Sequence, residues 1–577
     1  MHPKLKWIVA ILVLASLPLA AQTIPVAERT LPNGMRFLFV EKHNVPTVAT
    51  GWVARVGAAN ERPGITGLSH MLEHMMKKGT KIIGTKDPVR DAQLMAEQDR
   101  VQAEIRGEMS LLREKQRRGE IEDMNDPKAR TPRLQQLLDE FNKLLAEQRT
   151  IMVKEELPKI YAQEGGAGRN AFTSTDMTAY VVTVPSNKLE LWCWLESDRL
   201  QNLVLREFYS ERDVILEERR QGLEATPTGL IDEQFEAMLW TAHPYHWGVI
   251  GWKSDIGQVT REQAEEYFKT FYAPHNLTAV LVGDIKPDEA WPLIEHYFSR
   301  IPPSNRAVPE MITMEPPQKG EQRMIAEADT TPSVEIHYKT VPQVHKDYPA
   351  LQAFAGLLNG RSGRLYKALV ADQKVATSAA SSASSLKYAG EFIFFGNPTP
   401  ERRPEDVETA LYQQIDKLQK EPVTDRELQK VKNQVEVQSW AALESNFGLM
   451  VQLMMNEAAG SYKDLIEMPA RLRAVTREDV QRVAQKYFTK ENRSVLILNR
   501  KAATVDDPEL AKLPPEVQSM VKARLARLAA ITDADGLRKA LAQLEASSAQ
   551  APEEMKPAVA YLIKVLRGRI QKLEDKR

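Results

Sequence analysis

The strongest constraint on the fold is a pattern that occurs twice, on either side of a proline-rich segment. In the first half the strand-like runs GMRFLFVEK and TVATGWVARVG precede the helical segment GLSHMLEHMMKKGT, and in the second half TPSVEIHYKT precedes DYPALQAFAGLLNGR. Strands mixed with helices in a non-strict order are typical of an α+β fold. We therefore expect two homologous α/β domains, each a sheet packed by helices. The segment between them, residues 301–322, is stiffened by Pro302, Pro303, Pro309, Pro316 and Pro317.

Residues 1–21 read as a secretory signal peptide. Lys4 and Lys6 precede an apolar run at about 7–17 and then small residues that end at Ala21. The run is too short for a comfortable membrane span, although an uncleaved anchor is the alternative. No later stretch reaches the ~18 consecutive apolar residues of a spanning helix. We expect an exported protein, periplasmic or secreted, with no membrane association after the signal is cleaved.

The remaining chain divides into four predicted parts. They are an N-terminal domain (22–300), the linker (301–322), a C-terminal domain (323–503) and a helical extension (504–577) to which the sequence assigns no function. A charged segment at about 87–157 interrupts the first domain, and its apolar residues recur at helical spacings. Thr131 and Pro132 fit an N-cap and a first helical position. This predicts an inserted helical hairpin, whose helices either pack only on each other or form a docking arm for a partner.

Composition excludes several classes of function. The 577 residues include 77 basic and 78 acidic side chains, a net charge of −1, which argues against a nucleic-acid binder that works by neutralising phosphates. The single cysteine, Cys193, excludes an intrachain disulfide framework and any thiolate-rich metal site. A metal would therefore need histidine and carboxylate ligands.

His70, Glu73 and His74 are the residues that carry chemistry. Two histidines four residues apart lie on one face of a helix, close enough to reach one ion. A Zn²⁺ held by two histidines and a third ligand keeps a position for water and lowers the pKa of that water to about 7. Glu73 projects beside the imidazoles and can act as the general base. The five-residue pattern also occurs by chance, but the chain has only 10 histidines.

A third ligand is expected on the predicted helix EFYSERDVILEERR. Glu211 and Glu218 are seven residues apart and face the same way, so one can bind the metal while the other hydrogen-bonds an imidazole. Glu217 points about 100° away and is the poorer choice. Without the histidine pair, a solvated acidic face would be the better interpretation.

Five segments in this order carry a family resemblance: HMLEH, NAFTSTDMTAYVVTVP, SERDVILEE, HPYHWGVIGW and YAPHNLTAVLVGDI. The chain resembles the inverzincin metallopeptidases, the family of pitrilysin, insulysin and mitochondrial processing peptidase, over roughly residues 23–500. The resemblance implies a bacterial-type, two-domain, zinc-bearing subunit. It also implies that such halves pair as a clamshell around a chamber that admits peptides and unfolded segments.

The resemblance further implies one Zn²⁺ per chain, bound by His70, His74 and Glu218, with Glu73 as base and Glu211 as a carboxylate that orients a ligand. In relatives the third ligand follows about half as far after HxxEH, whereas here 144 positions separate Glu218 from His74. The inserted hairpin accounts for the excess. The ligand set therefore remains the expected one.

The strand Asn170–Thr173 is the expected substrate-binding element. An edge strand can add a peptide as an extra strand, and in relatives the equivalent strand does so beside the metal. The resemblance thus assigns Asn170, Ala171, Phe172 and Thr173 to substrate binding. From alternation alone, Phe172 either lines a side-chain pocket or packs in the core.

The second half lacks the polar chemistry of the first. Gln352, Ala355 and Gly356 occupy the places of His70, Glu73 and His74. The resemblance also places an Arg and a Tyr, which hold substrate carbonyls in relatives, at positions that are Val370 and Thr377 here. Neither side chain supplies a cation or a phenol. We hypothesise a heterodimer with a homologous, metal-free partner subunit, and a homodimer is the runner-up.

Two other functions compete with a zinc endopeptidase that acts on peptides. One is a non-catalytic subunit that binds and scaffolds, and the intact HxxEH argues against it. The other makes the helical hairpin an assembly module attached to an incidental enzyme fold. Metal analysis would separate the first function from these two.

Overall fold

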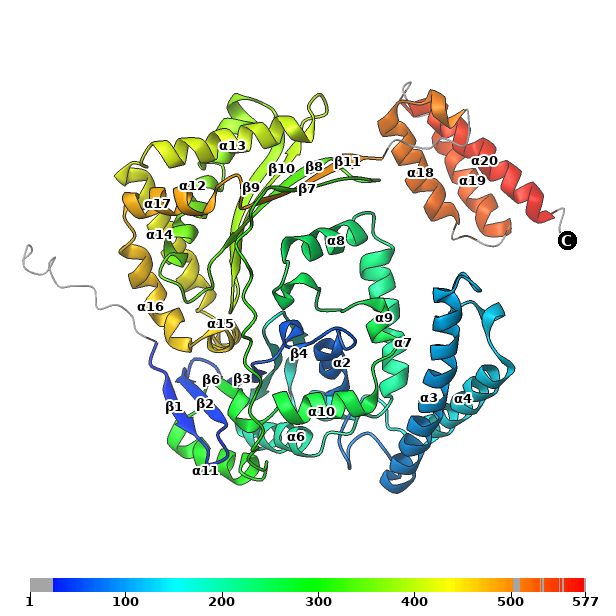
Figure 1. Cartoon of the computed structure of the whole chain (residues 1–577), viewed down its shortest axis with the longest axis vertical. Helices are drawn as coiled ribbons and strands as arrows, with labels where there is room; N and C mark the ends of the chain where they lie inside the picture. The colour runs from blue at the N-terminus through cyan, green and yellow to red at the C-terminus, as the bar shows by residue number, and fades with distance from the viewer. Residues whose placement is uncertain are drawn as a thin grey trace, which may run out of the picture. The chain divides into compact units, whose positions relative to one another are not determined.

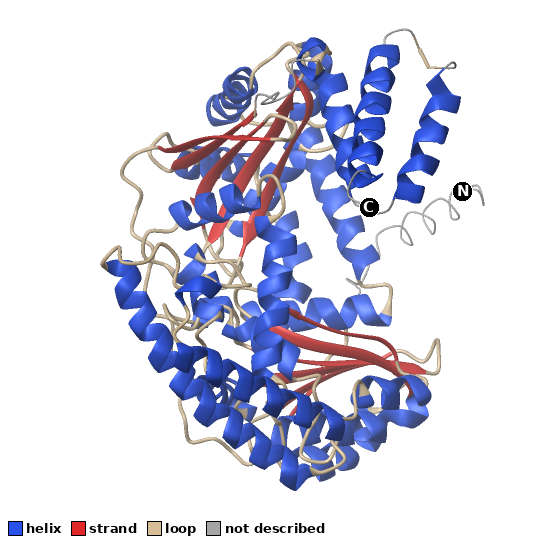
Figure 2. Ribbon diagram, turned by 90° about the vertical axis from the view of Figure 1, so that its right-hand side faces the viewer, coloured by secondary structure: helices blue, strands red, loops and turns tan. Residues whose placement is uncertain are grey.

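The computed structural model describes residues 24–501, 509–529, 531, 534–548, 551–552 and 555–574. The predicted signal peptide lies outside the described residues. The chain divides into two compact units, one drawn from Met1–Ile325 and Ser333–Ile497, the other from Ala326–Pro332 and Leu498–Arg577. The expected α+β class is confirmed, with two sheets packed by helices (Figure 2). The domain boundaries proposed from the sequence stay a prediction.

The first sheet has six strands, and the strand beside HxxEH lies at its edge (Figure 1). Its order is β1-β2-β6-β3-β5-β4. β2 and β6 are parallel, and every other neighbouring pair is antiparallel. The strands are β1 (Ala27–Thr30), β2 (Arg36–Glu41), β3 (Thr47–Ala54), β4 (Ala167–Thr173), β5 (Thr178–Pro185) and β6 (Leu277–Gly283).

The two faces of this sheet are covered by different halves of the chain. Along β3, Val48, Trp52 and Ala54 join the buried cluster formed with helices of the first half, whereas Ala49 and Val53 join a cluster formed with α15 (Asn446–Ala459) of the second half. This follows from the two-residue period of a strand. The first-half helices are α2 (Leu68–Met75), α6 (Leu189–Gln201), α7 (Phe208–Arg219), α8 (Gly229–Leu239), α9 (Lys253–Ile256), α10 (Arg261–Phe271) and α11 (Pro287–Phe298).

The second sheet repeats the strand order of the first. Its order is β7-β11-β8-β10-β9, which matches β2-β6-β3-β5-β4 strand by strand and places α12 where α2 stands in the first half. The strands are β7 (Gln322–Ala328), β8 (Ser333–Thr340), β9 (Ala376–Ser385), β10 (Gly390–Pro398) and β11 (Arg493–Arg500). The helices are α12 (Tyr348–Leu358), α13 (Pro404–Lys420), α14 (Asp425–Ala442), α15, α16 (Tyr462–Arg473) and α17 (Arg477–Tyr487).

A buried polar cluster also joins the two halves. The Tyr245 hydroxyl donates to the carboxylate of Asp176, with both oxygens at 2.9 Å. The same carboxylate accepts from the backbone N–H of Lys387 at 2.9 Å, and the N–H of Tyr388 donates to the Tyr245 hydroxyl at 3.1 Å. Asp176 therefore has two donors, one from each half of the chain, as a buried carboxylate requires.

The charged insertion consists of α3 (Pro88–Arg117), α4 (Pro132–Ile151) and the shorter α5 (Glu156–Gln163). Thr131 caps α4, its hydroxyl accepting from the N–H of Leu134 at 3.0 Å, and Pro132 takes the first helical position. Asp87 caps α3 in the same way.

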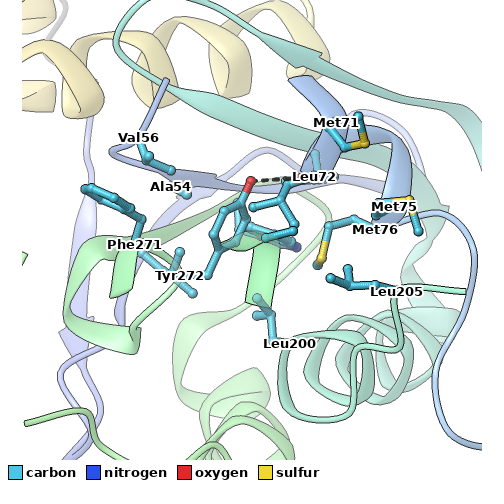
Figure 3. Close-up of a cluster of buried hydrophobic side chains, with 14 of the residues drawn as sticks. Ala54, Val56, Met71, Leu72, Met75, Met76, Leu200, Leu205, Phe271 and Tyr272 are labelled. Atoms are coloured by element: carbon cyan, nitrogen blue, oxygen red, sulfur yellow. Dashed lines mark hydrogen bonds between the residues drawn. The ribbon is translucent and has the colours of Figure 1, made fainter. Parts of the chain in front are cut away.

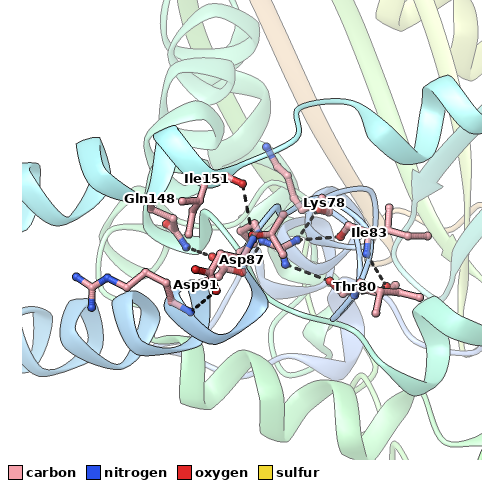
Figure 4. A network of polar contacts seen from close by, with 12 residues as sticks. Lys78, Thr80, Ile83, Asp87, Asp91, Gln148 and Ile151 are labelled. Carbon is pink, nitrogen blue, oxygen red and sulfur yellow. Dashed lines mark hydrogen bonds and ion pairs between the residues drawn. The ribbon is translucent and has the colours of Figure 1, made fainter.

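A buried arginine ties the base of this hairpin to the segment that follows α2 (Figure 4). Arg206 Nε lies 2.7 Å from Asp91 Oδ2 on α3, and Gln148 of α4 donates to the other Asp91 oxygen at 2.8 Å. The guanidinium also donates to the carbonyls of Lys78, Thr80 and Ile83. The insertion is thus fixed to the loop directly after HxxEH.

The C-terminal extension forms helices with a core of their own. They are α18 (Pro515–Ala529), α19 (Ala534–Ser548) and α20 (Lys556–Glu574), and Leu528, Leu537, Leu544 and Leu566 are among their buried side chains. None of the helices in the described part of the chain is both long and apolar enough to cross a membrane.

Short helical turns connect the longer elements. The 3-10 turns are η1 (Ala58–Asn60), η2 (Pro127–Ala129), η3 (Ser186–Lys188), η5 (Pro244–His246), η6 (Pro274–Asn276) and η8 (Leu510–Lys512). The π-helical turns are η4 (Arg220–Glu224) and η7 (Tyr366–Asp372).

Candidate metal centre

Helix α2 presents the three residues of the motif on one face because its other face is buried. Leu72 and Met75 pack into the core of the first half (Figure 3). A helix repeats every 3.6 residues, so this buried stripe leaves His70, Glu73 and His74 on the opposite side, where each is half-buried. Two imidazoles and a carboxylate are thereby held beside one another at the edge of the core.

The start of α2 is held by a buried carboxylate that the sequence did not single out. Gly67, with φ of +88°, supplies the left-handed turn before the helix. The two oxygens of Glu61 accept from the backbone N–H groups of Gly67 and Ser69, each at 2.7 Å. Burial raises the pKa of Glu61 to about 8, against the opposing effect of these hydrogen bonds. Glu61 thus fixes the position from which α2 begins.

Glu218 on α7 brings a third donor to the two imidazoles. His74 Nε2 lies 3.7 Å from Glu218 Oε2, and His70 Nε2 lies 3.9 Å from Glu218 Oε1. One donor atom from each residue falls within 4.8 Å of the other two. Tetrahedral zinc with bonds of about 2.0–2.2 Å would bring its donors to about 3.4 Å from one another. The three donors are therefore close to the spacing that zinc requires.

His70 is in the protonation state that a metal ligand requires. Burial, with smaller effects of His74 and Lys77, lowers the pKa of His70 to about 4, so this ring is neutral at pH 7. His70 Nδ1 is buried and makes no hydrogen bond with the described residues. A neutral imidazole offers a lone pair to a metal, whereas a protonated one does not. The donor set thus fits Zn²⁺ by both residue type and charge.

Glu211 contacts the ring nitrogen of His74 that does not face Glu218. Its Oε1 lies 2.9 Å from His74 Nδ1, and its Oε2 lies 2.6 Å from Lys78 Nζ. Burial alone would raise the pKa of Glu211, but the hydrogen bonds from His74 and Lys78 outweigh it and lower the pKa to about 2. The carboxylate is therefore ionised and accepts a hydrogen bond from Nδ1–H, while Nε2 of the same ring faces Glu218.

Glu73 is positioned as an acid–base group. Its Oε2 accepts a hydrogen bond from the hydroxyl of Thr173 on β4 at 3.1 Å. Burial raises the pKa of Glu73, while the nearby His74, the hydrogen bond from Thr173 and the charge of Lys77 act in the opposite direction. A carboxyl group whose pKa is moved toward neutrality can accept and return a proton more readily at pH 7.

Strand β4 carries the expected substrate residues, and among the described residues it pairs on one side only, with β5. Asn170 is exposed, Ala171 is half-buried, and Thr173 contacts Glu73. Phe172 packs against the cluster on the opposite face of the sheet, together with α15, which favours the core interpretation of this side chain over the pocket. The two-residue period of a strand explains the difference between Phe172 and its neighbours.

The other residues that the sequence analysis considered do not belong to the three-donor cluster. Glu217 is exposed and pairs with Arg220, as the helical wheel indicates. Val370 lies in the π-helical turn η7, and Thr377 is exposed on β9. Sequence reasoning missed Glu61 and Lys78 as positioning groups. Lys78 lies in the segment after α2, which ends at Met75, so the helical period gives no signal for it.

Comparisons with known proteins find two matching peptidase family models and several similar proteases. A model described as insulinase, peptidase family M16, matches residues 36–99, and one described as the peptidase M16 inactive domain matches residues 258–435. Zinc protease PqqE of Helicobacter pylori is 26% identical over 470 residues, which are 80% of this chain and 89% of that protein. A probable mitochondrial-processing peptidase subunit beta of Arabidopsis thaliana is 20% identical and covers 80% of this chain and 75% of its own length.

Solved structures share the fold. A protease from Helicobacter pylori has a TM-score of 0.66 at 24% identity and covers 82% of this chain and 99% of its own. A peptidase M16 inactive domain from Pseudomonas fluorescens has a TM-score of 0.62 at 15% identity, with 83% and 98% covered. The periplasmic protease PqqL from Escherichia coli has a TM-score of 0.60 at 16% identity, with 83% of this chain and 48% of that chain covered.

Proposed function

Since the chain belongs to the insulinase (M16) family of metallopeptidases, in which its relatives are named zinc proteases, we propose that it is a zinc-dependent endopeptidase subunit that hydrolyses peptides or unfolded segments. The observation that supports this most directly is the approach of Glu218 to both His70 and His74 within 4 Å. Two donors on α2 and a third on α7, which follows His74 by 144 positions, meet beside the carboxyl group of Glu73, whose pKa burial raises.

The chemistry follows from the roles of four side chains. Zn²⁺ held by His70, His74 and Glu218 would supply a Lewis acid that activates water and polarises a peptide carbonyl. Glu73 takes the proton of the attacking water and returns it to the leaving amine. The Thr173 hydroxyl, which donates to one Glu73 oxygen, keeps the other oxygen directed toward the water.

The substrate binds as an added strand on the free edge of β4. Backbone hydrogen bonds to an edge strand give affinity that depends little on sequence, which suits an enzyme for unfolded segments. Asn170 and Ala171 are the contacts expected on the peptide side of this strand. The chamber expected between paired halves belongs to the same proposal.

A partner subunit completes the site. Val370 and Thr377 stand where relatives carry the Arg and Tyr that hold substrate carbonyls, and neither can replace them. We infer a heterodimer with a homologous, metal-free subunit that supplies this pair, and a homodimer is the second possibility. Export to the periplasm or the exterior is part of the same proposal, and it rests on the signal-like residues 1–21.

A Glu73→Gln variant tests the mechanism. It keeps all three metal donors, so we expect one Zn²⁺ per chain by mass spectrometry, with peptide hydrolysis reduced at least about 10³-fold because the proton acceptor is lost. Glu217→Gln is the matched control, because Glu217 is exposed and pairs only with Arg220 and Gln221 among the described residues. Equal hydrolysis by Glu73→Gln and the parent would refute this role. A chain with no bound metal and no hydrolysis, even with its partner, would favour the scaffold alternative.

A further inference from the structure

A polar cavity of about 230 Å³ lies directly beside Glu73. Its walls come from α2, from α6 and from strands β4 and β5. Four charged side chains line it in addition to Glu73: Lys77, Arg169, Glu196 and Arg199. Asn170 and Ala171 of the proposed substrate strand line it as well.

One pair of these charges is already neutralised. Glu196 is buried and accepts from the indole N–H of Trp52 and from the Tyr161 hydroxyl, each at 2.6 Å. It also forms an ion pair with Arg199, which is equally buried and stacks over the Tyr180 ring at 4.7 Å. Three strong donors occupy both carboxylate oxygens of Glu196. This carboxylate therefore has little capacity left for the other cations of the cavity.

Lys77 and Arg169 remain, and the one other carboxylate of the lining is Glu73, whose pKa the charge of Lys77 lowers, so that two cations stand against one acid. Both side chains are half-buried, and neither forms an ion pair within 4.0 Å with any described residue. Burial and the neighbouring Arg199 lower the pKa of Arg169, and the weaker attraction of Glu196 does not offset them. A half-buried cation without a hydrogen-bonded carboxylate is costly unless a ligand completes it.

The two-residue period of β4 places Arg169 on the face of the strand that adjoins α2. Arg169 alternates with Asn170 and so shares a face with Ala171 and with Thr173, whose hydroxyl contacts Glu73. The pairing of β4 with β5 shifts register between Ala167 and Asn170, directly before this stretch. Arg169 and Ala171 both line the cavity.

We propose that this cavity receives the carboxylate of an aspartate or glutamate side chain from the substrate residue next to the cleaved bond, with Lys77 and Arg169 as its ligands. A peptide added to β4 presents alternate side chains to the same face, and the cavity opens beside Glu73, where the bond is cleaved. The inference rests on the proposed peptidase function and specifies its substrate class. It predicts an enzyme that selects acidic residues, although the backbone contacts to β4 are sequence-independent.

The test compares peptides that are identical except for Glu or Gln, scanned through the positions on either side of the cleaved bond. We expect kcat/KM to favour Glu by about tenfold or more at one position, as two charge-assisted hydrogen bonds would give. In Lys77→Met and Arg169→Gln this Glu/Gln ratio, measured within each variant, should fall toward one. Lys81→Met, an exposed lysine near the same helix, is the matched control and should keep the ratio of the parent.

A binding measurement separates this proposal from the peptidase function itself. Fluorescence anisotropy of the same labelled peptides with the Glu73→Gln variant needs no turnover, and the Glu peptide should bind more tightly than the Gln peptide. A ratio near one in an active parent enzyme, or a ratio that both variants leave unchanged, would overturn the cavity proposal. Selective binding of the Glu peptide without hydrolysis by the parent would instead support the cavity and count against the peptidase.

Discussion

The contact between Glu211 and His74 gives the sharpest test of how this site is organised. Glu211 accepts from His74 Nδ1 at 2.9 Å and from Lys78 at 2.6 Å, and it does not take part in the three-donor cluster. Its effect on zinc must therefore pass through the orientation and basicity of His74. Carboxylates in this position contribute about 10–100-fold to metal affinity in other metalloproteins.

Two substitutions of Glu211 should lower zinc affinity by different amounts within that 10–100-fold range. In Glu211→Gln the amide oxygen can still accept from His74, but the amide NH₂ then faces the ammonium of Lys78, so we expect zinc affinity to fall about tenfold, or about 1.4 kcal/mol. Glu211→Ala removes both acceptors and leaves the half-buried Lys78 without this carboxylate, so the loss should approach about 100-fold. Glu217→Gln, six residues along α7 and exposed, should leave zinc affinity unchanged.

The assay is a zinc titration against a chromogenic chelator at pH 7.5, accompanied by kcat/KM at saturating zinc. We expect affinity to fall in the order parent, Glu211→Gln, Glu211→Ala, and hydrolysis to recover largely when zinc is supplied in excess. Zinc affinity within twofold of the parent in Glu211→Ala would refute the argument that Glu211 orients His74. Loss of hydrolysis that excess zinc does not restore would assign Glu211 a role other than metal binding.

Two further predictions concern stability. Glu61→Ala removes the acceptor for two buried N–H groups at the start of α2 and should lower the free energy of unfolding by about 2–4 kcal/mol in urea titrations; an unchanged unfolding midpoint would contradict the capping role. Burial lowers the pKa of His337, but hydrogen bonds with Glu335 and Glu391 outweigh it and raise the pKa to about 9. Protonated His337 should therefore stabilise the folded state by an amount on the order of 3 kcal/mol. This stabilisation should be complete below pH 6.5 and disappear as pH rises through 9. Urea midpoints measured from pH 6 to 10 should lose part of that decline in His337→Gln and keep it in the more exposed control His345→Gln.

The sequence is sufficient to predict which side chains of one helix share a face. The 3.6-residue period alone places His70 and His74 on one face of α2, and it separates Glu211 and Glu218 from Glu217 on α7. The repeated pattern likewise agrees with the strand order of the second sheet, because each of its strands has a counterpart in the first sheet. These features are local or repeated, so the spacing of residues in the sequence is enough to predict them.

Contacts between distant elements could not be predicted in this way. The hydrogen bond from Thr173 to Glu73 joins β4 to α2 across 100 positions, and the cavity beside it is lined by α2, α6 and two strands that the sequence does not show to be neighbours. Alternation along Asn170–Thr173 leaves two interpretations of Phe172, and only the packing of α15 on the far face of the sheet decides between them. The same division runs through the site itself. The helical period places His70 beside His74 and Glu211 on the face of Glu218, but the meeting of α2 with α7 depends on tertiary packing. The approach of Lys77 and Arg169 to one cavity depends on tertiary packing in the same way.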